Sequence, residues 1–219
     1  MSEHNEDTCI IHMVRHGQTI LNREVRFRGR RDVPLNDVGR SEAIAAGHML
    51  RPEGIGAVYS SPLGRALEVG TAIATASNLD KVEPWEDLVN VDYGRWEGLT
   101  IEESDEVDPA AWEAYKNDPE NAQCPGGEKL IAAADRVVRA LRAIGAAHPG
   151  QSVAAVSHGV MLRLAVLMVA GPVTEDWQFK ISTGGSIVFA VTNGEIRLVT
   201  DASTLSGSRM DTIKVPTSV

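Results

Sequence analysis

Two histidines and two arginines follow segments that are expected to be buried strands. Arg15-His16-Gly17-Gln18-Thr19 follows the apolar run at 8–14, Arg65 follows the run at 54–60, and Ser157-His158-Gly159 follows the run at 152–156. Because ligands bind beyond the carboxyl ends of strands in open α/β sheets, we expect these side chains to meet at one sheet edge. Guanidinium groups favour a phosphate dianion, and an imidazole can attack phosphorus. The set therefore predicts phosphoryl transfer that needs no metal.

Two other chemistries fit the same segments less well. Ala155-Val156-Ser157-His158-Gly159 is close to the GxSxG elbow of serine hydrolases, whose histidine follows the serine along the chain. Here no histidine follows a usable acid beyond Ser157. His12 and His16 are four residues apart, but the glutamate of the HExxH zinc motif is missing. We expect His12 to pack within the first strand.

The elements that must position these residues alternate between strand and helix. Apolar β-prone runs predict the strands, and apolar spacings of three and four predict the helices. Strands are expected at 8–14, 54–60 and 152–156, an extended segment within 81–92, helices at 36–50, 62–77, 128–147 and 160–170, and a hairpin of 186–191 with 196–200 around Asn193-Gly194. The alternation predicts an α/β fold with helices on both faces of a mainly parallel sheet and one antiparallel strand.

Length and composition set the outer limits. The 219 residues, 43% hydrophobic and 23% charged, are expected to form one domain over 1–219, with a cap insertion at about 95–127. A net charge of −9 argues against nucleic acid and anionic membrane surfaces as partners. The apolar run at 160–171 contains Arg163 and is too short for a membrane span, and the start is polar, so we expect a cytoplasmic protein. A homodimer is compatible with the sequence.

The charge is distributed unevenly along the chain. Six arginines between Arg15 and Arg31 face only Glu24, which gives this window a net charge of +5. Residues 83–120 hold thirteen acidic residues against Arg95 and Lys116, a net charge of −11. The basic window begins at the proposed nucleophile, which is where a phosphate ester needs a positive field.

At this point the motifs resemble a known family. Arg15-His16-Gly17-Gln18-Thr19 with Asn22 resembles the RHGxTxxN signature of the histidine phosphatase superfamily, in its phosphoglycerate-mutase-like branch. Further motifs follow in the family's order over about residues 9–192: Asp32-Val33-Pro34-Leu35 with Gly39, Ser60-Ser61-Pro62 through Arg65, the segment 93–98, the segment 125–128, and Ser157-His158-Gly159.

The resemblance implies a three-layer α/β/α sandwich and a role for each matched residue. His16 would be the phosphorylated nucleophile, with Arg15, Arg65 and His158 completing the phosphate pocket. Gln18, Thr19, Asn22 and Gly159 would line that pocket, and Arg28 and Gly29 are further candidates for substrate binding. The implied partner is a small phosphorylated metabolite, with no cofactor.

One departure from the family concerns the proton donor. The family usually has a glutamate three residues before the aromatic residue of its (F/Y)GxWEG motif, and here that position is Asn90. An amide cannot supply a proton to a leaving alkoxide. Asp92 lies two residues on, on the same side if the segment is extended. We expect either Asp92 or a water held by Asn90 to serve instead, unless Asp92 only caps the turn at Gly94.

A second departure concerns the reaction type. The mutases resembled here carry paired arginines in the cap, whereas this cap belongs to the acidic segment. The acidic segment favours hydrolysis over mutase chemistry and suggests a substrate whose other end is neutral or cationic. A phosphomutase, or a binding protein with reduced catalysis, remains an alternative. Trp96, Trp112 and Tyr115 of the cap could set specificity or belong to the core.

Overall fold

The fold is built on one mixed sheet. The computed structural model describes residues 6–172 and 177–205. Its strands are β1 (Thr8–Arg15), β2 (Ile55–Ser60), β3 (Glu83–Pro84), β4 (Ser152–Ser157), β5 (Ser186–Thr192) and β6 (Glu195–Leu198), in the order β3-β2-β4-β1-β5-β6. The pairs β1–β4, β2–β4 and β2–β3 are parallel, and β5 is antiparallel to β1 and to β6. The predicted mainly parallel sheet with one antiparallel strand is confirmed.

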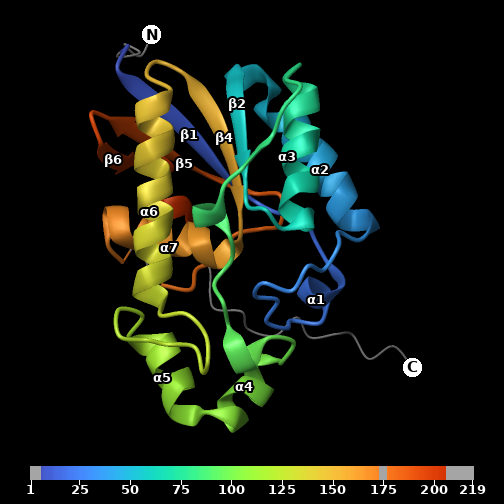
Figure 1. Ribbon diagram of the computed structural model, residues 1–219, viewed down its shortest axis with the longest axis vertical. Helices are drawn as coiled ribbons and strands as arrows, with labels where there is room; N and C mark the ends of the chain where they lie inside the picture. The colour runs from blue at the N-terminus through green and yellow to red at the C-terminus, as the bar shows by residue number, and fades with distance from the viewer. Residues whose placement is uncertain (1–5, 173–176, 206–219) are drawn as a thin grey trace.

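Helices cover both faces of this sheet. On one side lie α2 (Asp37–Leu50) and α3 (Gly64–Ala76), and on the other α6 (Leu130–Ala147) and α7 (Gly159–Ala170) (Figure 1). Residues along β4 alternate between the two faces, as strand geometry requires. Ala154 and Val156 join the apolar cluster of α2 and α3, while Val153 and Ala155 join that of α6 and α7. The result is the expected three-layer α/β/α sandwich.

The remaining elements gather at the end of the molecule to which the parallel strands lead (Figure 1). They are the helices α1 (Ile20–Arg23), α4 (Ile101–Val107) and α5 (Pro109–Asn117). Thr100 and Glu103 form a capping box at the start of α4, and Asp108 caps α5, whose first residue is Pro109. Four 3₁₀ turns complete the described chain, at 51–53, 86–88, 94–96 and 202–205.

Two local features differ in how well the sequence predicts them. The extended segment expected within 81–92 shrinks to the two residues of β3, followed by a 3₁₀ turn. The hairpin turn is as predicted, because Asn193 (φ 53°) and Gly194 (φ 82°) both adopt the left-handed conformation that tight hairpins need. His12 lies in β1 and is 5% exposed. None of the helices within 6–172 and 177–205 has the length and apolarity that a bilayer crossing needs.

Candidate active site

The register of the sheet brings the two histidines together. Arg15 in β1 pairs with Ser157 in β4, so His16 and His158 are the next residues of two neighbouring parallel strands. The His16 backbone N–H donates to the Ser157 carbonyl at 3.0 Å. The two imidazole rings lie with their centroids 5.1 Å apart. The prediction that these strand ends meet at one edge is therefore confirmed by the pairing itself.

His16 is buried and held in one tautomer. Its Nδ1 lies 2.7 Å from the Gly17 carbonyl oxygen, and since a carbonyl can only accept, Nδ1 carries the proton. The lone pair is then on Nε2. Burial lowers the pKa of His16 well below its usual value, and Arg65, Arg28 and Arg15 lower it further. The neutral imidazole is the form that can attack phosphorus.

His158 is also neutral but bonded differently. Its Nδ1 lies 3.5 Å from the Arg65 guanidinium, which can only donate, so the proton is on Nε2 and is donated to Ser61 Oγ at 2.8 Å. Burial and then Arg65 hold the pKa of His158 well below its usual value. The sequence analysis did not assign Ser61 a role. It follows β2 as His158 follows β4, and this strand-end position was the available signal.

Three arginines of the site have donors without acceptors. The Nε atoms of Arg15, Arg28 and Arg65 are buried and make no hydrogen bond within the described chain. The other ends of these side chains are anchored: Arg65 donates to the carbonyls of Gly29 (2.8 Å) and Arg31 (2.6 Å), and Arg15 donates to that of Ile181. Buried donors without acceptors are uncommon in native proteins. Together they suit an oxyanion with several oxygens.

A pocket of about 570 Å³, including its open mouth, lies beside these groups. His158, Gly159, Asn90 and six charged or aromatic residues of the site contribute to its lining: Arg15, Arg28, Arg163, Tyr93, Trp112 and Tyr115. His16 and Arg65 are 1% and 0% exposed and are not part of the lining; they contact it through His158. Trp96 is fully buried in the core, so of the three cap aromatics two line the pocket.

Arg163 is a site residue that the sequence analysis passed over. It is the one charged residue of α7 and is 7% exposed, with its Nε donating to the Phe179 carbonyl at 2.7 Å. A charge in an otherwise apolar, buried helix is rare and needs a partner or a ligand. That signal was present at residue 163, where the sequence analysis used it only to exclude a membrane span.

Four residues expected to bind substrate lie outside the lining and stabilise the surrounding loops instead. Thr19 and Asn22 form a capping box at the start of α1, and the Gln18 side chain accepts from Asn36 at 2.9 Å. The Gly29 carbonyl accepts from both Arg65 and Asn90. A substrate role for these residues stays a prediction, but their present bonds position the loop that carries His16 and Arg28.

Gly17 shows how closely this loop packs. A Cβ at position 17 would lie 2.4 Å from the Gly39 carbonyl oxygen, a distance that no side chain permits. Only glycine at position 17 lets the loop after β1 lie directly against the start of α2.

The two candidates for the proton donor point in different directions. Asn90 is 3% exposed and lines the pocket. Its Nδ2 donates to the Gly29 carbonyl at 3.1 Å, and its buried Oδ1 has no donor within 6–172 and 177–205. Asp92 is not in the lining, and its Oδ1 accepts from the Gly94 backbone N–H at 2.9 Å. The structure thus brings Asn90 to the site and gives Asp92 a turn to cap.

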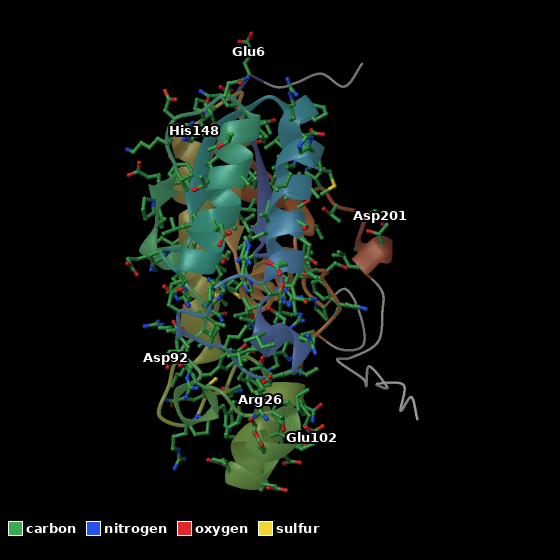
Figure 2. The ribbon with its side chains drawn as sticks, turned by 90° about the vertical axis from the view of Figure 1, so that its right-hand side faces the viewer. Glu6, Arg26, Asp92, Glu102, His148 and Asp201 are labelled. Carbon is green, nitrogen blue, oxygen red and sulfur yellow. The ribbon has the colours of Figure 1, made fainter. Side chains whose placement is uncertain are left out.

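The acidic segment does not face the pocket. Among the described residues no aspartate or glutamate contributes to the pocket lining. Glu103 forms an ion pair with Arg26 at 2.9 Å, and Glu102 is exposed at the end of the molecule formed by α4 (Figure 2). The expectation that this charge acts on the substrate therefore loses its basis, because the carboxylates of the segment lie outside the pocket lining.

The two neutral histidines predict a fold that weakens in acid. Their pKa values are lowered in the folded chain, whereas the unfolded chain protonates its histidines below about pH 6.5. The contribution of the two neutral histidines to the free energy of unfolding is therefore fully present above that pH, and it is lost as the pH falls below it. Replacing His16 by Asn should reduce the slope of unfolding free energy against pH, between about pH 6 and 5, by up to about 1.4 kcal/mol per pH unit. Urea unfolding at each pH measures it; superimposable slopes for the two proteins would contradict a neutral His16.

Comparison with known proteins agrees with this geometry. An α/β/α sandwich whose strand ends bring two neutral histidines and buried arginines to one pocket is the arrangement of an enzyme that handles phosphate esters. Residues 11–203 match the histidine phosphatase superfamily (branch 1). The chain belongs to this superfamily.

Three relatives illustrate the likeness. The bifunctional protein Rv2228c of Mycobacterium tuberculosis is 41% identical over 159 residues, which are 70% of this chain and 43% of that protein, so the chain spans less than half of the first relatives' length. Phosphoserine phosphatase 1 of Hydrogenobacter thermophilus is 30% identical over 168 residues, 76% of this chain and 79% of that one. The solved structure of Bacillus stearothermophilus YhfR has a TM-score of 0.79 at 26% identity, covering 89% of this chain and 96% of that one.

Proposed function

We propose that this chain hydrolyses a small phosphate monoester through a phosphohistidine on His16. One observation carries the proposal: a neutral imidazole with its Nε2 lone pair available lies beside three buried guanidinium groups, whose Nε–H donors have no acceptor among the described residues. These donors match the equatorial oxygens of a transferring phosphoryl group, where positioning and charge neutralisation supply most of the catalysis.

In the first step His16 displaces the alcohol. Nε2 attacks phosphorus and forms the P–N bond while the P–O ester bond breaks. The proton stays on Nδ1, which donates it to the Gly17 carbonyl, and this hydrogen bond stabilises the positive charge that develops on the ring. Arg65 is positioned for the phosphoryl oxygens by its own bonds to the Gly29 and Arg31 carbonyls.

The leaving oxygen needs a proton, which the Asn90 amide cannot give. Because Asn90 Nδ2 is bound to Gly29, its Oδ1 is presented as a buried acceptor. We propose that a water donates one hydrogen to this oxygen in a hydrogen bond and transfers its other proton to the leaving alkoxide. The hydroxide formed in this way is the nucleophile of the second step. An acid role for Asp92 would require its carboxylate to release the Gly94 N–H.

In the second step the hydroxide formed from this water hydrolyses the intermediate. Its oxygen bonds to phosphorus, the P–N bond breaks, and inorganic phosphate leaves as His16 returns to its neutral form. The relative named phosphoserine phosphatase supports hydrolysis as the outcome. The cap also lacks the paired arginines of the mutases, since the cation of α5, Lys116, forms an ion pair with Glu113.

The test is to follow the phosphoryl group. We expect the wild-type chain to release inorganic phosphate from p-nitrophenyl phosphate. When its reaction with a ³²P-labelled ester is quenched without acid, we expect the label to be trapped on His16. Label on His16 with transfer to a second alcohol, but no free phosphate, would instead identify a phosphomutase. Tight binding of the ester with neither label nor phosphate release would identify a binding protein and overturn the proposal.

A further inference from the structure

One residue of the pocket lining has a backbone conformation that its own side chain disfavours. Val25 has a φ of 57°, and among the described residues it is the one position with a positive φ that is neither glycine nor asparagine. A β-branched side chain is a genuine outlier in this left-handed region, because its Cβ crowds the backbone. Strain of this kind persists where the surrounding structure imposes it, and it is frequent at functional sites.

The conformation of Val25 follows from the way in which α1 ends. The Val25 N–H donates to the Asn22 carbonyl at 3.3 Å, and the Arg26 N–H donates to the Leu21 carbonyl at 3.0 Å. These two bonds form the Schellman motif, in which the residue after the C-cap has a positive φ and is usually glycine or asparagine. The apolar contact that often accompanies the motif does not involve this residue. The end of the helix therefore gives no reason for a valine at position 25.

The same motif ends α3 with a residue that suits it. The Asn78 N–H donates to the Thr75 carbonyl at 3.2 Å, and the Leu79 N–H donates to the Ala74 carbonyl at 2.8 Å. Asn78 also has a φ of 57°, which asparagine tolerates. It is exposed and does not belong to the pocket lining. The two turns thus share their hydrogen bonds and differ in whether the residue with positive φ reaches the pocket.

The side chain of Val25 supplies apolar surface to the pocket. It is partly buried and belongs to the lining. An antiparallel bridge joins Arg26 to Thr100, so that Val25 comes near Ile101, the first residue of α4 and another apolar member of the lining. The pocket thus combines guanidinium groups for the phosphoryl end of an ester with an apolar surface that a phosphoryl group does not need.

We propose that Val25 is a specificity-determining residue, which together with Ile101 contacts a hydrocarbon part of the substrate's alcohol. The inference rests on the proposed function, because it assigns the phosphoryl group to His16. The substrate class is phosphate monoesters whose alcohol carries an unsubstituted alkyl or aryl part. Glycine or asparagine at position 25 would relieve the strain but remove the apolar surface, so the chain gives up stability for selectivity.

The test is a series of n-alkyl phosphates from methyl to hexyl, bound to the His16→Ala chain so that no turnover occurs. Calorimetry should show Kd falling along the series, by up to about fourfold for each methylene that becomes buried. Adding Val25→Gly should raise the Kd of hexyl phosphate by about fivefold or more and change that of methyl phosphate by less than about twofold. It should also raise Tm by about 2–4 °C, because glycine adopts a positive φ without strain.

Asn78→Val is the matched control. It places the same strained residue in the same motif outside the pocket, so it should lower Tm by about 2–4 °C and leave the Kd of each alkyl phosphate unchanged. Val25→Ile keeps both the β-branch and the apolar surface, so it should bind hexyl phosphate as tightly as valine does.

Three results would overturn the role of Val25. A lower Tm for Val25→Gly would show that the valine stabilises the loop. An unchanged Kd for hexyl phosphate would show that the side chain does not contact the alcohol, and an equal loss for hexyl and methyl phosphate would show that it does not select. If Val25→Gly acts as expected but the wild-type chain forms no phosphohistidine, the hydrolysis mechanism fails and the role of Val25 stands.

Discussion

Replacing His16 by alanine should lower the turnover of p-nitrophenyl phosphate by at least about 10⁴-fold, the scale expected when a covalent nucleophile is removed. Among the described residues no other imidazole can take its place. His158 is the nearest imidazole, but its Nε2 proton is donated to Ser61 and its Nδ1 faces Arg65. Steady-state phosphate release, with purification that excludes contaminating phosphatases, measures the loss.

His48→Ala supplies the control for this result. His48 is exposed on α2, away from the pocket lining, and its removal should leave turnover unchanged. The His16→Ala chain should also keep its far-ultraviolet circular dichroism, so that lost activity is not lost structure. Activity within tenfold of the wild type would refute His16 as the nucleophile.

The largest effect on stability is expected from Arg136→Ala. Arg136 is 8% exposed and forms an ion pair with Glu128 at 2.9 Å. Its guanidinium also donates to the carbonyls of Asp87, Val89 and Asn90. Removing it takes the guanidinium donor from three carbonyls and the main ion-pair partner from a largely buried carboxylate, which should lower the free energy of unfolding by about 3–5 kcal/mol. Urea denaturation measures this directly.

Arg139→Ala, one turn further along α6, separates this effect from a general loss of arginine. Arg139 makes two hydrogen bonds to the Asp87 carboxylate, at 2.8 and 2.9 Å, but its side chain is 63% exposed. Such an exposed pair contributes little to stability, because solvent screens it. If both variants lose the same free energy of unfolding, the buried hydrogen bonds of Arg136 contribute no more to stability than the exposed pair does. Arg136 also holds the backbone of Asn90, so its loss should disturb the site as well as the fold.

The parts of the site that the sequence could predict are those fixed by strand topology. Arg15-His16 and Ser157-His158 each follow a short apolar run, and parallel pairing of two such runs forces their ends together. That inference needs only the periodicity of the chain and the rule for open sheets. The hairpin at Asn193-Gly194 was predictable in the same way, from local backbone preferences.

The sequence could not predict those features of the site that depend on the direction in which a side chain points. Asp92 was placed beside Asn90 on the assumption of an extended segment, but the chain turns at Gly94 and the carboxylate folds back to cap that turn. The acidic run was expected to face the substrate, although its carboxylates find basic partners or solvent. Thr19 and Asn22 match a family motif, yet their spacing of three is also that of a helix cap, which is the role their hydrogen bonds show.

In the proposed mechanism, the hydrogen bond between the His16 ring and the Gly17 carbonyl decides which positional isomer of phosphohistidine can form. With Nδ1 committed to the backbone, phosphorus can add only at the ring nitrogen farther from the main chain, which gives the tele isomer. The peptide group of one glycine thus sets the regiochemistry of the covalent adduct before any substrate arrives. The same bond fixes the plane of the ring, so the approach of an ester is restricted in direction as well as in site of attack.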